Sequence, residues 1–86
     1  MKEREVVIGH RLGLHARAAA KLVQLAAQFK SNIVLKRDGA AASEADARSI
    51  LSILLLAAGY GSTLSVRVDG ADEEEALEKV CEYLSG

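Results

Sequence analysis

The sequence predicts an α+β fold in which a four-stranded, mainly antiparallel sheet carries three helices on one face. Three observations support this prediction. Apolar and polar residues alternate in three segments, as in strands with one buried face, and apolar residues recur at helical spacing in two others. An Asp38-Gly39 turn signal joins two extended segments into a hairpin. In chain order the elements are strand, helix, strand, strand, helix, strand and helix.

The first two elements are the most clearly patterned. Residues 3–8 are expected to form a strand that buries Val6 and Ile8, and glycines at 9 and 13 bound the loop that follows. Residues 16–30 then predict an amphipathic helix. Its polar stripe carries Arg17, Lys21, Gln24 and Gln28, and its apolar stripe carries Ala19, Leu22, Val23, Ala26 and Phe29.

The remaining elements follow the same reasoning. Residues 32–37 alternate as a strand, and a weakly specified return strand is expected within 40–45, where alanines have poor strand propensity. Residues 49–58 are apolar almost throughout and predict a short buried helix that ends at Gly59 or Gly61. Residues 63–68 are expected to form the last strand, and residues 72–84 predict a helix with acids in its first turn.

Length and composition bound the functions to consider. The chain has 86 residues, which suit one small domain spanning 1–86 or a fragment of a larger protein. Its core must be aliphatic, because the chain has one Phe, two Tyr and no Trp. Nucleic-acid binding by base stacking on aromatic side chains is therefore not expected.

Cysteine, histidine and hydropathy give further expectations. The single Cys81 excludes an intramolecular disulfide, favours a cytoplasmic location, and is expected to be a buried small hydrophobe in the last helix. One Cys and two His at no metal-ligand spacing predict neither a metal site nor a metal cofactor. The longest apolar stretch, residues 50–58, is far shorter than the roughly 20 residues that span a bilayer, and the N-terminus carries no targeting signal.

The charges are unevenly distributed along the chain. Residues 1–43 hold eight Lys and Arg against three Asp and Glu, a charge of +5, whereas residues 44–86 hold three against nine, a charge of −6. Such a division favours a positive face that attracts phosphate or an acidic partner. Two solvated faces of opposite sign are the alternative interpretation.

The most informative segment is residues 13–19, of sequence GLHARAA, which places His15 between a glycine-containing loop and the start of a helix. Backbone N–H groups at a helix start lack partners within the helix and bind anions. Arg17 adds a guanidinium suited to phosphoryl oxygens, and a neutral imidazole can itself accept a phosphoryl group. A helix cap without further function is the alternative for His15, and no role is assigned to His10.

Four segments resemble one family in the right order and over essentially the whole chain. Residues 13–17 (GLHAR), with Ala19, are similar to the phosphorylation motif of the histidine-containing phosphocarrier proteins (HPr) of the phosphoenolpyruvate-dependent phosphotransferase system. Residues 46–51, 59–62 and 69–73 are similar to that family's regulatory-serine segment, its loop before the last strand and its final strand-to-helix turn. The resemblance implies an open-faced β-sandwich of βαββαβα order.

The resemblance also implies a function and its residues. His15 would accept a phosphoryl group on Nδ1 from enzyme I and pass it to IIA domains of a sugar system or a nitrogen-related counterpart, with Arg17 as the charge partner of the phosphate. Such a protein is a monomeric carrier without a cofactor, rather than an enzyme. Ser49 would be the target of a serine kinase and phosphorylase. The docking surface for both partners would comprise Ala20, Lys21, Gln24, Ala27, Ile50, Leu51 and Leu54.

The chain departs from the family pattern in two places. Ala18 stands where the family usually has proline, and the stretch between Gly39 and Ser49 is about three residues longer than usual, with the surplus near 40–42. Ser49 is expected close to His15, because the family fold is expected to bring the starts of the first two helices together. A helix N-cap is the alternative for Ser49. The alternative function is a regulatory or anion-binding module of similar architecture, in which His15 and Arg17 hold an anion without covalent chemistry.

Overall fold

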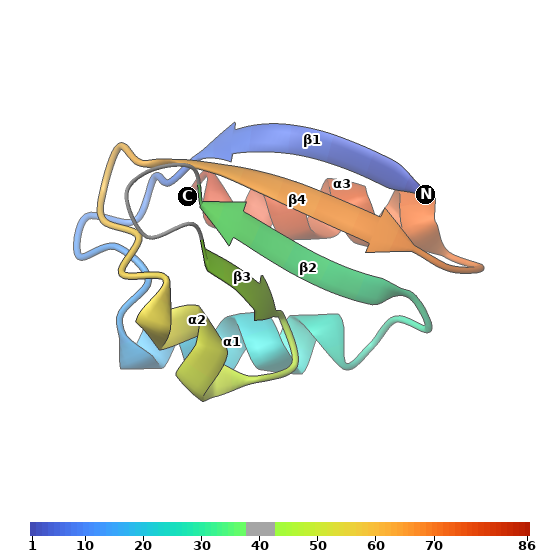
Figure 1. Ribbon diagram of the computed structural model, residues 1–86, viewed down its shortest axis with the longest axis horizontal. Helices are drawn as coiled ribbons and strands as arrows, with labels where there is room; N and C mark the ends of the chain where they lie inside the picture. Colours follow the sequence, from blue (N-terminus) through green and yellow to red (C-terminus); the bar gives the residue numbers. More distant parts are fainter. Residues whose placement is uncertain (38–42) are drawn as a thin grey trace.

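A computed structural model describes residues 1–37 and 43–86. Its four strands form one antiparallel sheet in the order β1-β4-β2-β3 (Figure 1). The elements along the chain are β1 (Lys2–Val7), α1 (Ala16–Ala26), β2 (Asn32–Arg37), β3 (Ser43–Asp46), α2 (Ile50–Leu55), β4 (Thr63–Asp69) and α3 (Glu73–Leu84). The predicted element order and the antiparallel sheet are confirmed.

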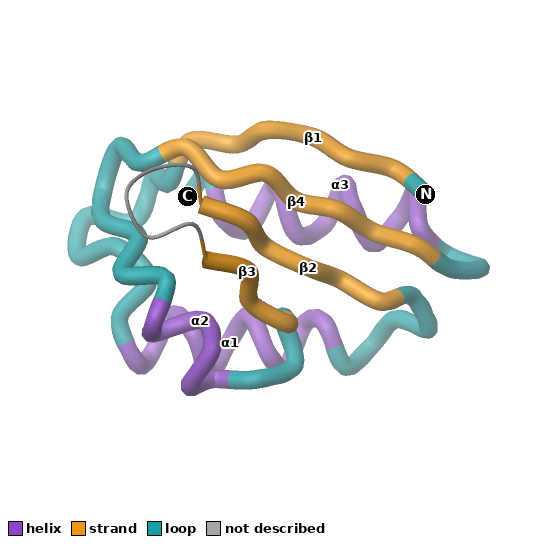
Figure 2. Tube along the Cα trace, viewed as in Figure 1, coloured by secondary structure: helices purple, strands orange, loops and turns teal. Residues whose placement is uncertain are grey.

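The helices form a second layer on one side of the sheet, as the sequence predicts. Helix α3 packs against β1 and β4, and α2 packs against β3 (Figure 2). Helix α1 contacts both α2 and α3, so the three helices form one continuous layer. The architecture is the expected open-faced sandwich. None of the helices that the structure describes has the length and apolar character of a membrane-spanning segment.

The alternation of the two central strands explains the burial of the sheet. In β4, Leu64, Val66 and Val68 are fully buried toward the helices, whereas Ser65 and Arg67 lie between them and remain partly exposed. In β2, Ile33 and Leu35 are buried in the same way. Helix α1 contributes its predicted stripe of Ala19, Leu22, Ala26 and the following Phe29, while Val23 is half-buried at the margin.

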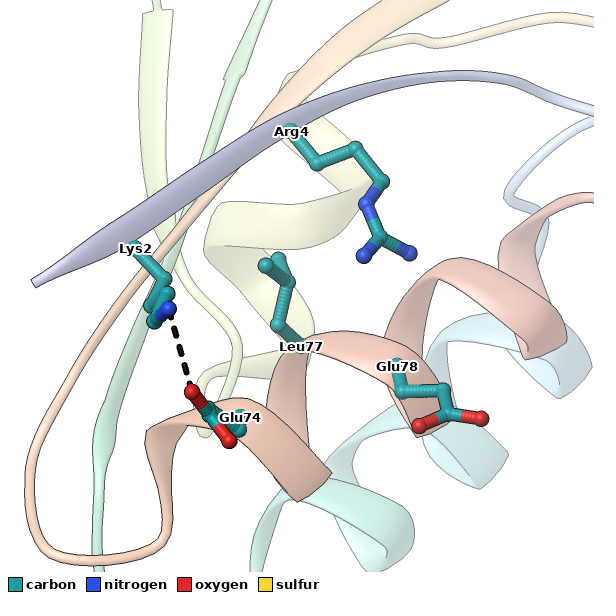
Figure 3. Close-up of a pocket in the computed structure, with 5 residues that line it drawn as sticks. All are labelled: Lys2, Arg4, Glu74, Leu77 and Glu78. Carbon is teal, nitrogen blue, oxygen red and sulfur yellow. Dashed lines mark ion pairs between the residues drawn. The ribbon is translucent and has the colours of Figure 1, made fainter.

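Strand β1 is an edge strand and differs from this pattern. Its register with β4 places Lys2 and Arg4 on the side that faces α3, yet both remain exposed. Figure 3 shows them above the acidic face of α3, where Lys2 Nζ lies 3.1 Å from a Glu74 carboxylate oxygen. The hollow between β1 and α3 has a volume of about 260 Å³, and both positive and negative side chains line it. Charged inward positions on an edge strand discourage pairing with another sheet.

Two helices end earlier than the sequence predicts. Helix α1 ends at Ala26 instead of Lys30, because Gln28 and Phe29 donate to carbonyls only three residues back and turn the chain so that Phe29 is buried. Helix α2 ends at Leu55 instead of Ala58, and Ala57 adopts a left-handed φ of 51°. The Arg37 guanidinium donates to the carbonyls of Leu56 and Ala57 at 2.9 and 2.8 Å.

The return strand of the predicted hairpin is β3, Ser43–Asp46. The surplus residues expected at 40–42 lie outside the described residues.

Candidate functional site

His15 is the N-cap residue of α1. Its backbone is extended, with φ −73° and ψ 176°, and its Nδ1 accepts a hydrogen bond from the Arg17 N–H at 3.2 Å. An atom that accepts from an N–H carries a lone pair, so in the neutral ring the proton resides on Nε2. The capping and phosphoryl-accepting interpretations of His15 therefore concern the same nitrogen atom.

The loop before His15 is fixed by its contact with the segment that follows α2. The Leu14 N–H donates to the Ala58 carbonyl at 2.9 Å, and the Leu14 side chain is buried. Gly13 has φ +70°, and a Cβ there would lie 2.6 Å from the Ala58 carbonyl oxygen. Glycine is required at this position because both the backbone conformation and the close approach exclude a side chain.

A depression of about 160 Å³ opens beside His15. Its lining residues are His10, His15, Arg17, Ala18, Lys21 and Tyr83. Arg17 and Lys21 lie four residues apart on α1, so they share one face of that helix, and both are exposed. Two cations beside a helix N-terminus give this depression the character of an anion site.

Sequence reasoning missed two residues of this depression. His10 lies beside Tyr83, with ring centroids 4.8 Å apart, and its Nε2 is 2.7 Å from the Tyr83 carbonyl oxygen. The Tyr83 hydroxyl in turn donates to the Ala18 carbonyl at 3.2 Å. These residues come from opposite ends of the chain, so no local sequence pattern could bring them together. The one signal in the sequence was Tyr83 itself, an aromatic residue beside the apolar stripe of the last helix.

Ser49 has a defined structural role but not the expected location. It is the N-cap of α2, and its hydroxyl accepts from the Ser52 N–H at 3.2 Å. The segment that follows the end of α2 contacts the loop before α1 through Ala58. The expectation that the starts of α1 and α2 meet is therefore wrong, because the two helices place the start of one beside the end of the other (Figure 1).

The candidate docking residues lie on two helices that pack together. Lys21 and Gln24 are exposed on α1, and so is Ala27, its C-cap residue. Ile50 and Leu51 are exposed on α2, where Leu51 keeps 67% of its surface accessible. Ala20 and Leu54 are half-buried. The expectation of a buried α2 is wrong: Ile53 is its one buried residue, and Leu55, which the sequence reasoning did not single out, is 70% exposed. A helix of only six residues at the edge of a sheet buries a narrow stripe of its surface, which leaves its other apolar side chains exposed.

The other candidate residues have structural surroundings. Cys81 is buried on α3, and burial raises the pKa of its thiol. A thiol in this state is a poor nucleophile. Within residues 1–37 and 43–86, no three His, Cys, Asp or Glu side chains cluster as metal ligands.

Known proteins are similar to this chain in sequence and in fold. The family described as "PTS HPr component phosphorylation site" matches residues 2–85. Phosphocarrier protein HPr of Cupriavidus necator is 47% identical over 91% of this chain and 84% of its own length, and phosphocarrier protein NPr of Shewanella violacea is 40% identical over 92% and 84%. The crystal structure of an HPr from Bacillus anthracis superposes with a TM-score of 0.88, at 37% identity over 96% of this chain and 95% of that one. With its histidine-capped helix, its cationic depression and its open-faced sandwich, this chain belongs to the HPr family of phosphocarrier proteins of the phosphotransferase system.

Proposed function

We propose that this chain carries a phosphoryl group on Nδ1 of His15, which it accepts from enzyme I and donates to a IIA domain. The observation that carries the proposal is the position of Nδ1, whose lone pair lies at the start of α1 beside the Arg17 N–H. Arg17 and Lys21 line the same depression and supply positive charge for the three phosphoryl oxygens. One loop and the first two turns of α1 thus contribute both the nucleophile and the positive charge that the transfer needs.

The transfer step balances without a cofactor. The Nδ1 lone pair of His15 attacks the phosphorus of phosphorylated enzyme I, a nitrogen–phosphorus bond forms, and the bond from phosphorus to the donor side chain breaks. The electron pair of that broken bond leaves with the donor, and the His15 proton stays on Nε2. Phosphoryl transfer depends mostly on positioning and charge stabilisation, which a small carrier and its partner supply together.

The proposed partners dock on the exposed surface of α1 and α2. Ile50 and Leu51 offer apolar contact, and Lys21 offers charge to an acidic partner. We place the carrier in the cytoplasm as a monomer, and we propose Ser49 as the substrate of a regulatory kinase. The acceptor is a IIA domain, and the similarity to proteins named HPr and NPr makes a sugar branch and a nitrogen branch the two acceptors to compare.

Incubation with phosphoenolpyruvate and enzyme I tests the proposal. Intact mass should increase by one phosphoryl group in the parent, and acid should remove that group, because a phosphoramidate hydrolyses in acid whereas a phosphoserine survives. His15→Ala should gain no acid-labile phosphate. Subsequent incubation with IIA domains of each branch identifies the acceptor. A label on His10, or a parent that only binds phosphate reversibly, would contradict the proposal and favour the anion-binding module.

A further inference from the structure

The proposed chemistry makes competing demands on one atom. His15 Nδ1 holds the first turn of α1 by accepting from the Arg17 N–H, and the same lone pair must form the bond to phosphorus. Once Nδ1 is phosphorylated it accepts no hydrogen bond, so the cap is lost during the step that needs the helix start in place. An N-cap bond typically stabilises a helix start appreciably, and first turns fray without one.

Apart from the burial of Ala18 and Ala19 in the core, few hydrogen bonds or charges hold the first turn of α1. No acidic residue lies there to interact with the helix dipole. The Ala18 N–H donates no hydrogen bond to a residue that the structure describes, and the turn contains no proline to restrict its backbone. The remaining backbone bond at the start runs from the Ala19 N–H to the His15 carbonyl, at 2.8 Å.

A hydrogen bond from outside the helix also holds this turn, and it does not depend on Nδ1. The Tyr83 hydroxyl, at the end of α3, donates to the Ala18 carbonyl at 3.2 Å across 65 positions of sequence. The Tyr83 residue is itself fixed, because His10 Nε2 lies 2.7 Å from its carbonyl oxygen and the two rings pack together. Burial raises the pKa of the Tyr83 phenol, which keeps the hydroxyl a neutral donor.

We propose that Tyr83 is a positioning residue for phosphoryl transfer: its hydroxyl holds the first turn of α1 in place while His15 Nδ1 exchanges its cap bond for a bond to phosphorus. The inference rests on the proposed function of His15. Tyr83 lines the depression at the site but acts through Ala18, and so through the backbone that carries Arg17. His10 helps to hold Tyr83 in position for this hydrogen bond, through its own contacts with the Tyr83 carbonyl and ring.

The test compares single-turnover transfer from phosphorylated enzyme I in the parent and Tyr83→Phe. Loss of one neutral hydrogen bond should slow transfer at saturating enzyme I about three- to tenfold. The concentration of phosphorylated enzyme I that gives half the maximal rate should stay within about twofold, because docking is unchanged. Tyr60→Phe is the matched control, since the Tyr60 side chain is exposed and its hydroxyl bonds to no described residue. It should transfer at the parent rate.

Ala18→Pro supplies the rescue. Proline fixes φ in the first turn at a position whose N–H is not needed, so it should restore transfer in Tyr83→Phe to within about twofold of the parent. A purely structural role for Tyr83 would lower the thermal midpoint of Tyr83→Phe without changing its transfer rate. Parent-like transfer in Tyr83→Phe, or a rate that proline in the first turn does not restore, would overturn the proposal.

A second measurement needs no phosphorylation. Amide hydrogen exchange of Arg17 and Ala19, the two N–H groups bonded to His15, should be about three- to tenfold faster in Tyr83→Phe than in the parent. Unchanged exchange would overturn the positioning role even if the parent is phosphorylated. A parent that accepts no phosphoryl group would instead overturn the proposed function, while faster exchange in the variant would still support the contact with the first turn.

Discussion

The backbone and the side chain of Arg17 have different surroundings, so the proposed function separates a folding role from a chemical one. Its backbone N–H donates to His15 Nδ1, whereas its side chain makes no ion pair within the described residues and lines the depression. A substitution of Arg17 changes the side chain but keeps the backbone N–H. It therefore removes the positive charge and retains the hydrogen bond to His15 Nδ1. The two contributions of this residue can therefore be measured separately.

Arg17→Ala should slow phosphoryl transfer by about one to two orders of magnitude, because a charge-assisted contact to phosphate contributes roughly 1.5 to 3 kcal/mol. Its free energy of unfolding should change by less than about 0.5 kcal/mol, as for other exposed substitutions. Stopped-flow transfer rates and thermal melts measure both. Lys79→Ala removes a positive charge from α3 and is the control for net charge. A variant that melts earlier yet transfers normally would make Arg17 a structural residue.

At the scale of elements, α3 begins with a contact that ties two turns together. Asp72 is its N-cap residue but makes no side-chain bond to its own helix. Its carboxylate instead accepts from the Ser31 hydroxyl at 2.6 Å and from the Lys30 N–H at 2.9 Å. These hydrogen bonds, the one from Ser31 foremost, lower the pKa of Asp72 below its usual range.

The lowered pKa of Asp72 predicts a pH dependence of stability. Because the folded state holds the carboxylate ionised more strongly than the unfolded state, the contribution is present above the unfolded pKa, near 4, and is lost as pH falls through the folded pKa. Asp72→Asn should therefore melt at a lower temperature than the parent at neutral pH, and the difference should shrink as the pH is lowered below about 4. Glu82→Gln, at an exposed position of α3, should show no such pattern. A difference that is constant with pH would contradict this account.

The elements also show which parts of this fold were predictable from sequence. The spacing of apolar residues predicted β2, β4 and the buried faces of α1 and α3 correctly, because apolar residues recur where an element faces the core. Helix ends were misplaced because tertiary contacts decide them: Arg37 bonds the carbonyls after α2, and the turn after α1 buries Phe29. His15 and Arg17 were found because a loop-to-helix junction is local. Tyr83 and His10 join the site through contacts between the two ends of the chain, which no local pattern contains.

At the scale of the whole molecule, Ser49 lies beside the proposed docking surface but away from His15, the proposed phosphoryl acceptor. Helix α2 has six residues, about 9 Å of rise, between Ser49 at its start and the segment that contacts the loop before His15. Ile50 and Leu51 of the proposed docking surface directly follow Ser49. A negative charge at position 49 should therefore act on the approach of an acidic partner more than on His15 itself.

Ser49→Asp should reproduce this effect without unfolding the protein. Aspartate can still cap α2, so the thermal midpoint should stay near that of the parent. Transfer from enzyme I should slow at low salt and partly recover as salt rises, because the Debye length shrinks to about 10 Å at 0.1 M and screens repulsion between the new charge and the partner. Ser49→Ala loses the cap without adding charge, and so should lower the midpoint while leaving the salt dependence of transfer unchanged. Equal rates for the parent and Ser49→Asp at low salt would leave Ser49 a helix cap without influence on docking.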